Sequence, residues 1–449
     1  MKRGKHSVTL SLLNETEFEA FVERFMDREK VPGLAIAISQ EGEVIYQKGF
    51  GMRDLETKEP VSPTTIFGVA SVTKSFTAMA IMQLVAEGKL ALEDPVIKHI
   101  PSFQLSDGSD SSRVQIRHLL SHTTGVPPMV RREDLTKLND HLDYLASASY
   151  ELLGEPGEYI SYCNDTFLLL GAIIERVTGR LYRRYVSDLL LEPLEMHRST
   201  FSLEELARLQ NVSVPYVKQA GLSEVKKAEW PTLGNYEVGG GIRSNVLDLL
   251  KYGQLYVNGG RIHEKAIASE ALLQGMWQPV HPLTRTAWYG YALRVVPNYA
   301  VGVTLVEHGG GQSGVSSNFG FVPEKGLVVA VLSNLDQVPI RDVWLAAVNG
   351  CLGFPLDQKE EREPDYVASP EELEKLVGTY LSAEGGHMSV FLREGNPVVD
   401  VAGTEFELRP SGSDTLVIKA NEMPIRFFFK TEQKVWAALL GLRMLTRSE

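Results

Sequence analysis

The stretch Gly68–Gly88, GVASVTKSFTAMAIMQLVAEG, carries the clearest structural and chemical signal in the chain. Apolar residues such as Met79 and Leu84 recur along it at helical spacing, and a glycine follows the last of them. The pattern predicts a helix from about Val72 to Gly88.

Ser71 and Lys74 lie three residues apart at the start of this helix, so their side chains share one helix face. A serine hydroxyl is a weak nucleophile that needs a base within hydrogen-bond reach. Lysine can be that base only where burial or nearby positive charge lowers its pKa. Apolar flanks such as Phe67 and Phe76 favour burial. A short motif of this kind also occurs as a helix cap followed by a solvated lysine.

Tyr162 and Asn164 precede a second predicted helix, Asp165–Val177. Two residues apart in an extended segment, their side chains point the same way. Tyrosine can pass a proton to a leaving group, and asparagine can hold a substrate amide. The ordinary alternative is a buried tyrosine and a helix-capping asparagine. Cys163, with no local histidine, is expected to pack as a small apolar group.

His308, Gly309, Gly310 and Gly311 form a glycine-rich run at the end of a predicted strand. Glycines allow a backbone to approach a ligand, and their amides can stabilise an oxyanion. The lysine and hydroxyl residue that end a phosphate-binding loop are missing after these glycines. A flexible turn is the alternative.

Other catalytic and metal patterns find no support. His118 and His122 lie four apart, but no glutamate directly follows His118 and no third zinc ligand is evident. The sequence contains no Gly-x-Ser-x-Gly elbow of the α/β-hydrolase type. We therefore expect neither a metal nor another cofactor.

Bulk properties limit the classes of protein further. A chain of 449 residues, 43% hydrophobic and 23% charged, is expected to form at least two folded units. Its net charge of -12 argues against a nucleic-acid partner. The two cysteines, the lack of a signal-length apolar run near the N-terminus and the lack of a membrane-spanning stretch predict a cytoplasmic protein with no membrane partner.

Strand patterns occur at both ends of the first 356 residues. A helix containing Phe18 and Phe25 precedes a hairpin of residues 34–39 and 43–50, and strands return within residues 288–334. A mixed sheet built from both ends, packed against a helical region, would close this α+β pattern. After an acidic linker, seven short strand candidates suggest a small barrel: Val377–Leu381, Met388–Arg393, Val398–Val401, Glu405–Arg409, Thr415–Lys419, Ile425–Lys430 and Val435–Leu440.

Taken together and in this order, the three motifs resemble those of the serine β-lactamase and penicillin-binding-protein superfamily, in particular its class C β-lactamase-related branch. The resemblance covers about residues 15–350. It implies a mixed sheet flanked by helices, with a helical subdomain beside the site. It also includes the stretches 67–84, 117–125, 156–179, 239–248 and 308–334.

By this resemblance Ser71 attacks a carbonyl, while Lys74 and Tyr162 handle the proton, in an order left open. Asn164, His308, Gly309 and Gly310 would contact the substrate, and the amides of Ser71 and Gly311 would form the oxyanion hole. His308 stands where β-lactamases carry the lysine of Lys-Thr-Gly, a fixed cation replaced by a group that ordinarily titrates near neutrality. This departure weakens the expectation of true lactamase activity.

The C-terminal tail resembles the lipocalin-like barrel of an archaeal self-compartmentalising serine peptidase, which implies a homo-oligomer. We expect a hydrolase domain at residues 15–356, a linker at 357–370 and a barrel at 371–449. The expected function is acyl-enzyme hydrolysis of small amides or peptides, D-residues included. Alternatives are a carboxylesterase or weak β-lactamase, a non-catalytic penicillin-binding sensor, and a barrel binding protein whose hydrolase part is incidental.

Overall fold

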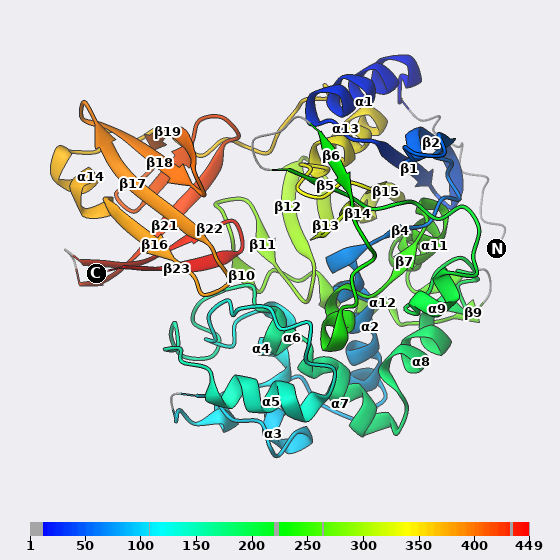
Figure 1. Cartoon of the computed structure of the whole chain (residues 1–449), viewed down its shortest axis with the longest axis horizontal. Helices are drawn as coiled ribbons and strands as arrows, with labels where there is room; N and C mark the ends of the chain where they lie inside the picture. The colour runs from blue at the N-terminus through cyan, green and yellow to red at the C-terminus, as the bar shows by residue number, and fades with distance from the viewer. Residues whose placement is uncertain (1–11, 107, 220–223, 263–264, 432–433, 449) are drawn as a thin grey trace.

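The computed structural model describes residues 12–106, 108–219, 224–262, 265–431 and 434–448. Figure 1 shows a large sheet with helices on both faces, a helical region beside it, and a separate barrel formed by the C-terminal part of the chain. The α+β class, the helix-flanked sheet and the all-β barrel expected from the sequence are confirmed.

The large sheet has nine strands in the order β10-β11-β12-β13-β14-β15-β1-β2-β3, with antiparallel pairing at each described step. It combines strands from both ends of the first 340 residues, as the sequence predicted. The strands are β1 (Gly33–Gln40), β2 (Glu43–Asp54), β3 (Glu59–Pro60), β10 (His281–Pro282), β11 (Trp288–Tyr289), β12 (Arg294–Ala300), β13 (Val303–Gln312), β14 (Val315–Val322) and β15 (Leu327–Ser333).

Side chains of the central strands alternate between two hydrophobic cores. In β1, Ile36 joins a core with α1 (Glu15–Glu29) and α13 (Arg341–Leu352), whereas Ala37 joins a core with α2 (Thr73–Ala86) and α11 (Val246–Val257). Because strand side chains alternate with period two, near-continuous apolar strands can bury both faces. The sheet is therefore the middle layer between two layers of helices.

The remaining helices and short strand pairs complete the part of the chain that precedes the barrel. No helix in the described ranges is long and apolar enough to cross a membrane. The helices are α3 (Val96–His99), α4 (Ile116–Ser121), α5 (Leu138–Ser147), α6 (Asn164–Phe167), α7 (Leu169–Thr178), α8 (Tyr182–Val186), α9 (Leu203–Leu206), α10 (Glu237–Gly240) and α12 (Glu270–Met276). The paired strands are β4 (Phe67–Gly68) with β7 (Arg243–Ser244), β5 (Tyr216–Lys218) with β6 (Val225–Lys227), and β8 (Arg261–Ile262) with β9 (Lys265–Ala266).

After α14 (Pro370–Leu376), eight antiparallel strands form a closed barrel. Seven match the strand candidates of the sequence, and the eighth, β23, was not predicted. The strands are β16 (Gly378–Leu381), β17 (His387–Arg393), β18 (Asn396–Val401), β19 (Thr404–Pro410), β20 (Thr415–Ile418), β21 (Met423–Thr431), β22 (Lys434–Leu440) and β23 (Arg443–Arg447). The barrel packs around its own core, which includes Tyr380 and Phe427.

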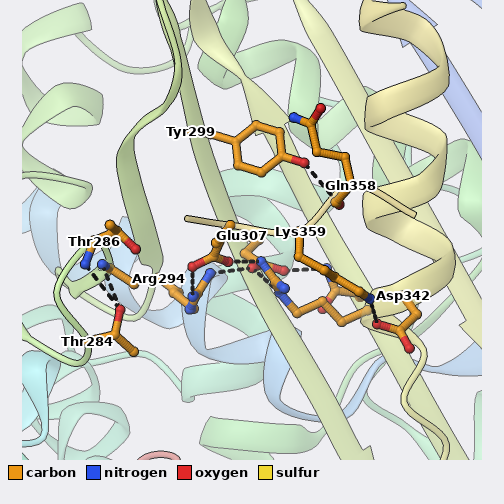
Figure 2. A network of polar contacts seen from close by, with 12 residues as sticks. Thr284, Thr286, Arg294, Tyr299, Glu307, Asp342, Gln358 and Lys359 are labelled. Atoms are coloured by element: carbon orange, nitrogen blue, oxygen red, sulfur yellow. Dashed lines mark hydrogen bonds and ion pairs between the residues drawn. The ribbon is translucent and has the colours of Figure 1, made fainter. Parts of the chain in front are cut away.

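A network of two arginines and two glutamates ties the segment before the barrel to the sheet (Figure 2). Glu360 pairs with Arg294 at 2.7 Å and with Arg341 at 2.6 Å, and both arginines also pair with the buried Glu307 of β13. The acidic linker is thus fixed to the sheet at Glu360, because Glu360 and the buried Glu307 each have both arginines beside them.

Candidate active site

Ser71 lies in a single 3-10 turn, Ala70–Val72, between β4 and the start of α2. The predicted helix is confirmed, although α2 itself begins only at Thr73. Ala70 has φ 44°, a left-handed value that disfavours a residue with a Cβ by about 1–2 kcal/mol. The turn is anchored to β14, because the Val69 carbonyl accepts a hydrogen bond of 2.7 Å from Ser317 Oγ.

Lys74 lies on the first turn of α2, with its side chain buried against the nucleophile. Its Nζ donates to Ser71 Oγ at 3.3 Å and to the Gly239 carbonyl at 2.9 Å. Burial, with added repulsion from Arg131 and Arg443, holds the pKa of Lys74 well below its usual value. A buried lysine that favours the neutral amine can accept a proton, as the sequence analysis required.

Tyr162 packs beside this lysine, with Lys74 Nζ 5.0 Å from the centroid of its ring. Its buried hydroxyl forms no hydrogen bond of good geometry among the described residues, although it lies close enough to the Ser71 hydroxyl to interact with it. Burial raises the pKa of Tyr162 to about 12, although the Ser71 hydroxyl and Arg443 oppose the rise. Tyr162 therefore carries its proton at neutral pH. The ring of His122 stacks on it with centroids 4.1 Å apart.

His308 is buried on β13, where its Nδ1 lies 2.5 Å from the Gly309 carbonyl and its Nε2 3.0 Å from the Tyr289 hydroxyl. Because a carbonyl can only accept, Nδ1 must donate, and Tyr289 then donates to Nε2. Burial and the nearby Lys74 lower the pKa of His308 to about 4. This corrects the expectation of titration near neutrality: the buried imidazole is neutral at pH 7.

The glycine run lies on the part of β13 that is paired with β14 but lies beyond the pairing with β12. It is strand rather than the flexible turn considered above. A Cβ at Gly310 would lie 3.0 Å from the Ser71 nitrogen and 2.5 Å from the Val69 carbonyl oxygen, so the missing side chain lets β13 approach the nucleophile. A Cβ at Gly311 would meet nothing within 4 Å.

Asn164 and Cys163 follow Tyr162 directly. Asn164 is the first residue of α6, and the N-cap is Cys163, so the capping role considered for Asn164 is not observed. Cys163 is buried and free, and burial raises the pKa of its thiol to about 12, which makes it an unreactive packing residue. The side chain of Asn164 is partly exposed.

The structure brings Ser71, Lys74, Tyr162 and the glycine run of β13 together from three separate segments. Sequence reasoning missed His122, which it considered only as a zinc ligand. Within the described ranges, no group of three or more histidine, cysteine, aspartate or glutamate residues could hold a metal ion. Sequence reasoning also missed Gly239, although this residue lies in the stretch 239–248 that resembles the family. It missed Arg443 as well, for which the sequence contains no signal.

Comparison with known proteins supports the family resemblance noted in the sequence. Protein flp of Staphylococcus aureus (strain MW2) is 34% identical over 229 residues, which are 50% of this chain and 46% of that protein. The match thus spans about half the length of this relative. Penicillin-binding protein 4 of Amycolatopsis lactamdurans is 27% identical over 375 residues, covering 79% of this chain and 94% of that protein.

Among solved structures, the octameric penicillin-binding protein homologue from Pyrococcus abyssi superposes with a TM-score of 0.72 at 29% identity, covering 97% of this chain and 100% of that one. SurE superposes with a TM-score of 0.74 at 22% identity, covering 96% and 98%, a likeness of fold. The family model described as Beta-lactamase matches residues 18–348, and the chain therefore belongs to this family.

Proposed function

We propose that this chain is a serine hydrolase that cleaves small amides or peptides, including those with D-amino acids, through an acyl-enzyme on Ser71. The observation that carries the proposal is the buried amine of Lys74, 3.3 Å from Ser71 Oγ and held in a setting that favours its neutral form. A solvated lysine would be protonated at neutral pH and unable to act as a base.

In the proposed reaction, Lys74 accepts the proton of Ser71 Oγ as this oxygen attacks the substrate carbonyl. The tetrahedral oxyanion is held by the amides of Ser71 and Gly311. Tyr162 donates its hydroxyl proton to the leaving group and recovers a proton from Lys74. Water then attacks the acyl-enzyme by the reverse proton path. Of the two candidate bases, Lys74 is favoured because the pKa of Tyr162 is raised to about 12.

The substrate would lie along β13, in contact with His308, Gly309 and Gly310, with its amide bound by Asn164. The neutral His308 supplies no fixed charge there, which favours peptides over β-lactams that rely on a cation at this position. A D-stereospecific amidohydrolase from Streptomyces sp. shares the fold at 24% identity, and SurE has been solved with D-Leu. Both motivate tests with D-peptides.

Intact-protein mass spectrometry tests the proposal. The wild-type chain and Ser71→Ala are incubated with an uncharged fluorophosphonate and, separately, with a penicillin. We expect the fluorophosphonate to add mass only to the wild type, at Ser71, and a penicilloyl adduct would extend the finding to peptide-like substrates. Absence of label on the folded wild type would reject the covalent mechanism and favour the non-catalytic sensor.

Carboxylesterase activity is the second candidate, because the same groups can attack an ester. Matched ester and amide substrates with one acyl group distinguish the two by their kcat/KM values. The domain limits given above, cytoplasmic location and homo-oligomer formation remain predictions. The last is supported by the octameric homologue from Pyrococcus abyssi and is checked by light scattering of the purified chain.

A further inference from the structure

His122 caps the C-terminal end of α4, a helix that lies beside α6 and thus near the segment that carries Tyr162 (Figure 1). Two hydrogen bonds to His122 bracket Tyr162. The Ser161 amide donates to the His122 carbonyl at 2.9 Å, and the Cys163 amide donates to His122 Nδ1 at 3.3 Å. A single residue of α4 therefore holds the backbone on both sides of the proposed proton donor.

The imidazole of His122 also packs against the ring of Tyr162. The two ring centroids lie 4.1 Å apart, with 29° between the ring planes. Phe167 lies 5.3 Å from the same imidazole at an angle of 26°. Lys74 Nζ is 5.0 Å from the centroid of Tyr162 and 5.2 Å from that of Phe167. His122 thus belongs to the group of aromatic rings next to the proposed base.

The contacts of His122 determine where its proton lies. Because a backbone amide can only donate, Nδ1 must accept, and a neutral ring then carries its proton on Nε2. Burial, with added repulsion from Lys74 and His308, holds the pKa of His122 well below its usual value, so the ring is neutral at pH 7. A neutral ring adds no charge beside Tyr162, and its contribution is therefore one of position.

Capping of α4 does not explain this side chain, because the cap is made by the backbone amide of His122. Its Nε2 is buried and has no hydrogen-bond partner within the residues that the structure describes, an unfavourable arrangement. Phenylalanine would avoid that cost but could not accept from Cys163, whereas asparagine could accept but offers no ring face. Histidine combines the acceptor with the face.

We propose that His122 is a positioning residue for Tyr162: its ring face and its Nδ1 together hold the phenol with the hydroxyl beside Ser71, ready to protonate the leaving group. The inference rests on the proposed function, in which Tyr162 is the proton donor. It has a specific consequence. A substrate whose leaving group departs without a proton should be cleaved without help from His122.

The test compares two leaving groups on one acyl group, in the p-nitrophenyl ester and the methylamide of N-acetyl-D-alanine. p-Nitrophenolate is a weak base that leaves without a proton, whereas methylamine must be protonated as it leaves. In His122→Asn, kcat/KM for the amide should fall roughly 30- to 100-fold, and kcat/KM for the ester by less than about threefold. If only esters are cleaved, the methyl ester replaces the amide, because methoxide also needs a proton.

His122→Asn is expected to fold, because His122 has φ 55° and asparagine suits this left-handed backbone while still accepting from Cys163. His118→Asn is the matched control. His118 is buried on the same helix, and its Nδ1 accepts from the Gln115 amide at 3.1 Å. Its ring is not among those that contact Tyr162 in the described part of the chain. This variant should keep the wild-type ratio of ester to amide cleavage.

A double variant tests whether His122 acts through Tyr162. Tyr162→Phe should itself slow amide cleavage selectively. In that background His122→Asn should slow it by less than about twofold more, since support has no effect once the supported hydroxyl is gone. Three results each overturn the inference: equal losses for ester and amide in His122→Asn, no loss for either, or a full further loss in the Tyr162→Phe background.

The two proposals fail separately. If the wild type cleaves neither substrate and the fluorophosphonate does not label Ser71, the proposed function fails. NMR of the whole chain with labelled tyrosine rings then decides the inference. The signal that disappears in Tyr162→Phe should shift in His122→Asn, because the imidazole face no longer shields it, and should stay in place in His118→Asn. A Tyr162 signal that is unchanged in His122→Asn overturns the inference.

Discussion

Replacing Gly239 by alanine should disable the proposed base without unfolding the protein. A Cβ at this position would lie 2.7 Å from Lys74 Nζ, against at least 3.4 Å for ordinary contact, so the amine must move by about 0.7 Å. The contact from Lys74 Nζ to Ser71 Oγ is already 3.3 Å, and such a shift would break it. Misplacement of about 1 Å costs roughly a hundredfold in rate, or about 2.7 kcal/mol of barrier.

The backbone gives no reason for Gly239→Ala to unfold the chain. Gly239 lies in α10 and is absent from the described residues with positive φ, so alanine suits its conformation and reduces the entropy of the unfolded state. We expect the free energy of unfolding to change by less than about 1 kcal/mol, a gain near 0.5 kcal/mol partly offset by the displaced lysine.

The assay pairs the second-order rate of fluorophosphonate labelling with urea unfolding, and Gly240→Ala is the control. A Cβ at Gly240 would lie 3.5 Å from Gln312 Oε1, an ordinary contact. Gly239→Ala should label roughly 30- to 100-fold more slowly than the wild type, whereas Gly240→Ala should label within about threefold of it. Equal rates for all three proteins, with stability retained, would refute the assignment of Lys74 as the base.

Three further changes test other parts of the structure. His308→Gln should reduce the dependence of the free energy of unfolding on pH between pH 4 and 6.5. In the wild type the folded imidazole has a pKa of about 4, so within this window the unfolded chain binds one more proton than the folded chain. The free energy of unfolding of the wild type should therefore rise with pH there, by up to about 3 kcal/mol, and the variant should lose this rise. Urea titrations at both pH values check this. Glu360→Gln should lower the free energy of unfolding by about 2 kcal/mol, which is less than for a fully buried pair because Arg341 is partly exposed. Glu361, whose side chain is 69% exposed, provides the control: Glu361→Gln should lower the free energy of unfolding by under about 0.5 kcal/mol in the same titration. Gly310→Ala should abolish labelling of Ser71 and lower the thermal midpoint, since its Cβ would meet the backbone of the nucleophile turn.

The sequence predicted those parts of the fold that local patterns encode. Alternation and turn residues identify the hairpin of β1 and β2, and a helical period identifies α2. β23 was missed because its five residues, Arg443–Arg447, offer neither strict alternation nor a strong turn pair ahead of it. A short strand of this kind forms because closing a barrel needs its backbone donors and acceptors, a demand that only the tertiary structure makes.

The candidate site divides in the same way. Ser71, Lys74 and Tyr162 were predictable because each motif is local and the family resemblance links them. The protonation state of His308 could not be predicted from the sequence, because its pKa depends on burial beside Lys74, which is more than 230 residues away in the chain. His122 was overlooked for a related reason: its spacing from His118 raised only the question of a metal pair, which was set aside, while its actual neighbour is the ring of Tyr162.

The barrel is structurally continuous with the candidate site, which argues against regarding the hydrolase part as incidental to a binding module. One core contains Ile160 and Tyr162 of the hydrolase together with Ala437 and Met444 of the barrel. The Tyr162 amide is satisfied by a barrel carbonyl, and a buried N–H without a partner costs about 1–3 kcal/mol. Removing the barrel would therefore expose an apolar surface and release the backbone of the proposed proton donor, so the two units are expected to fold and unfold together.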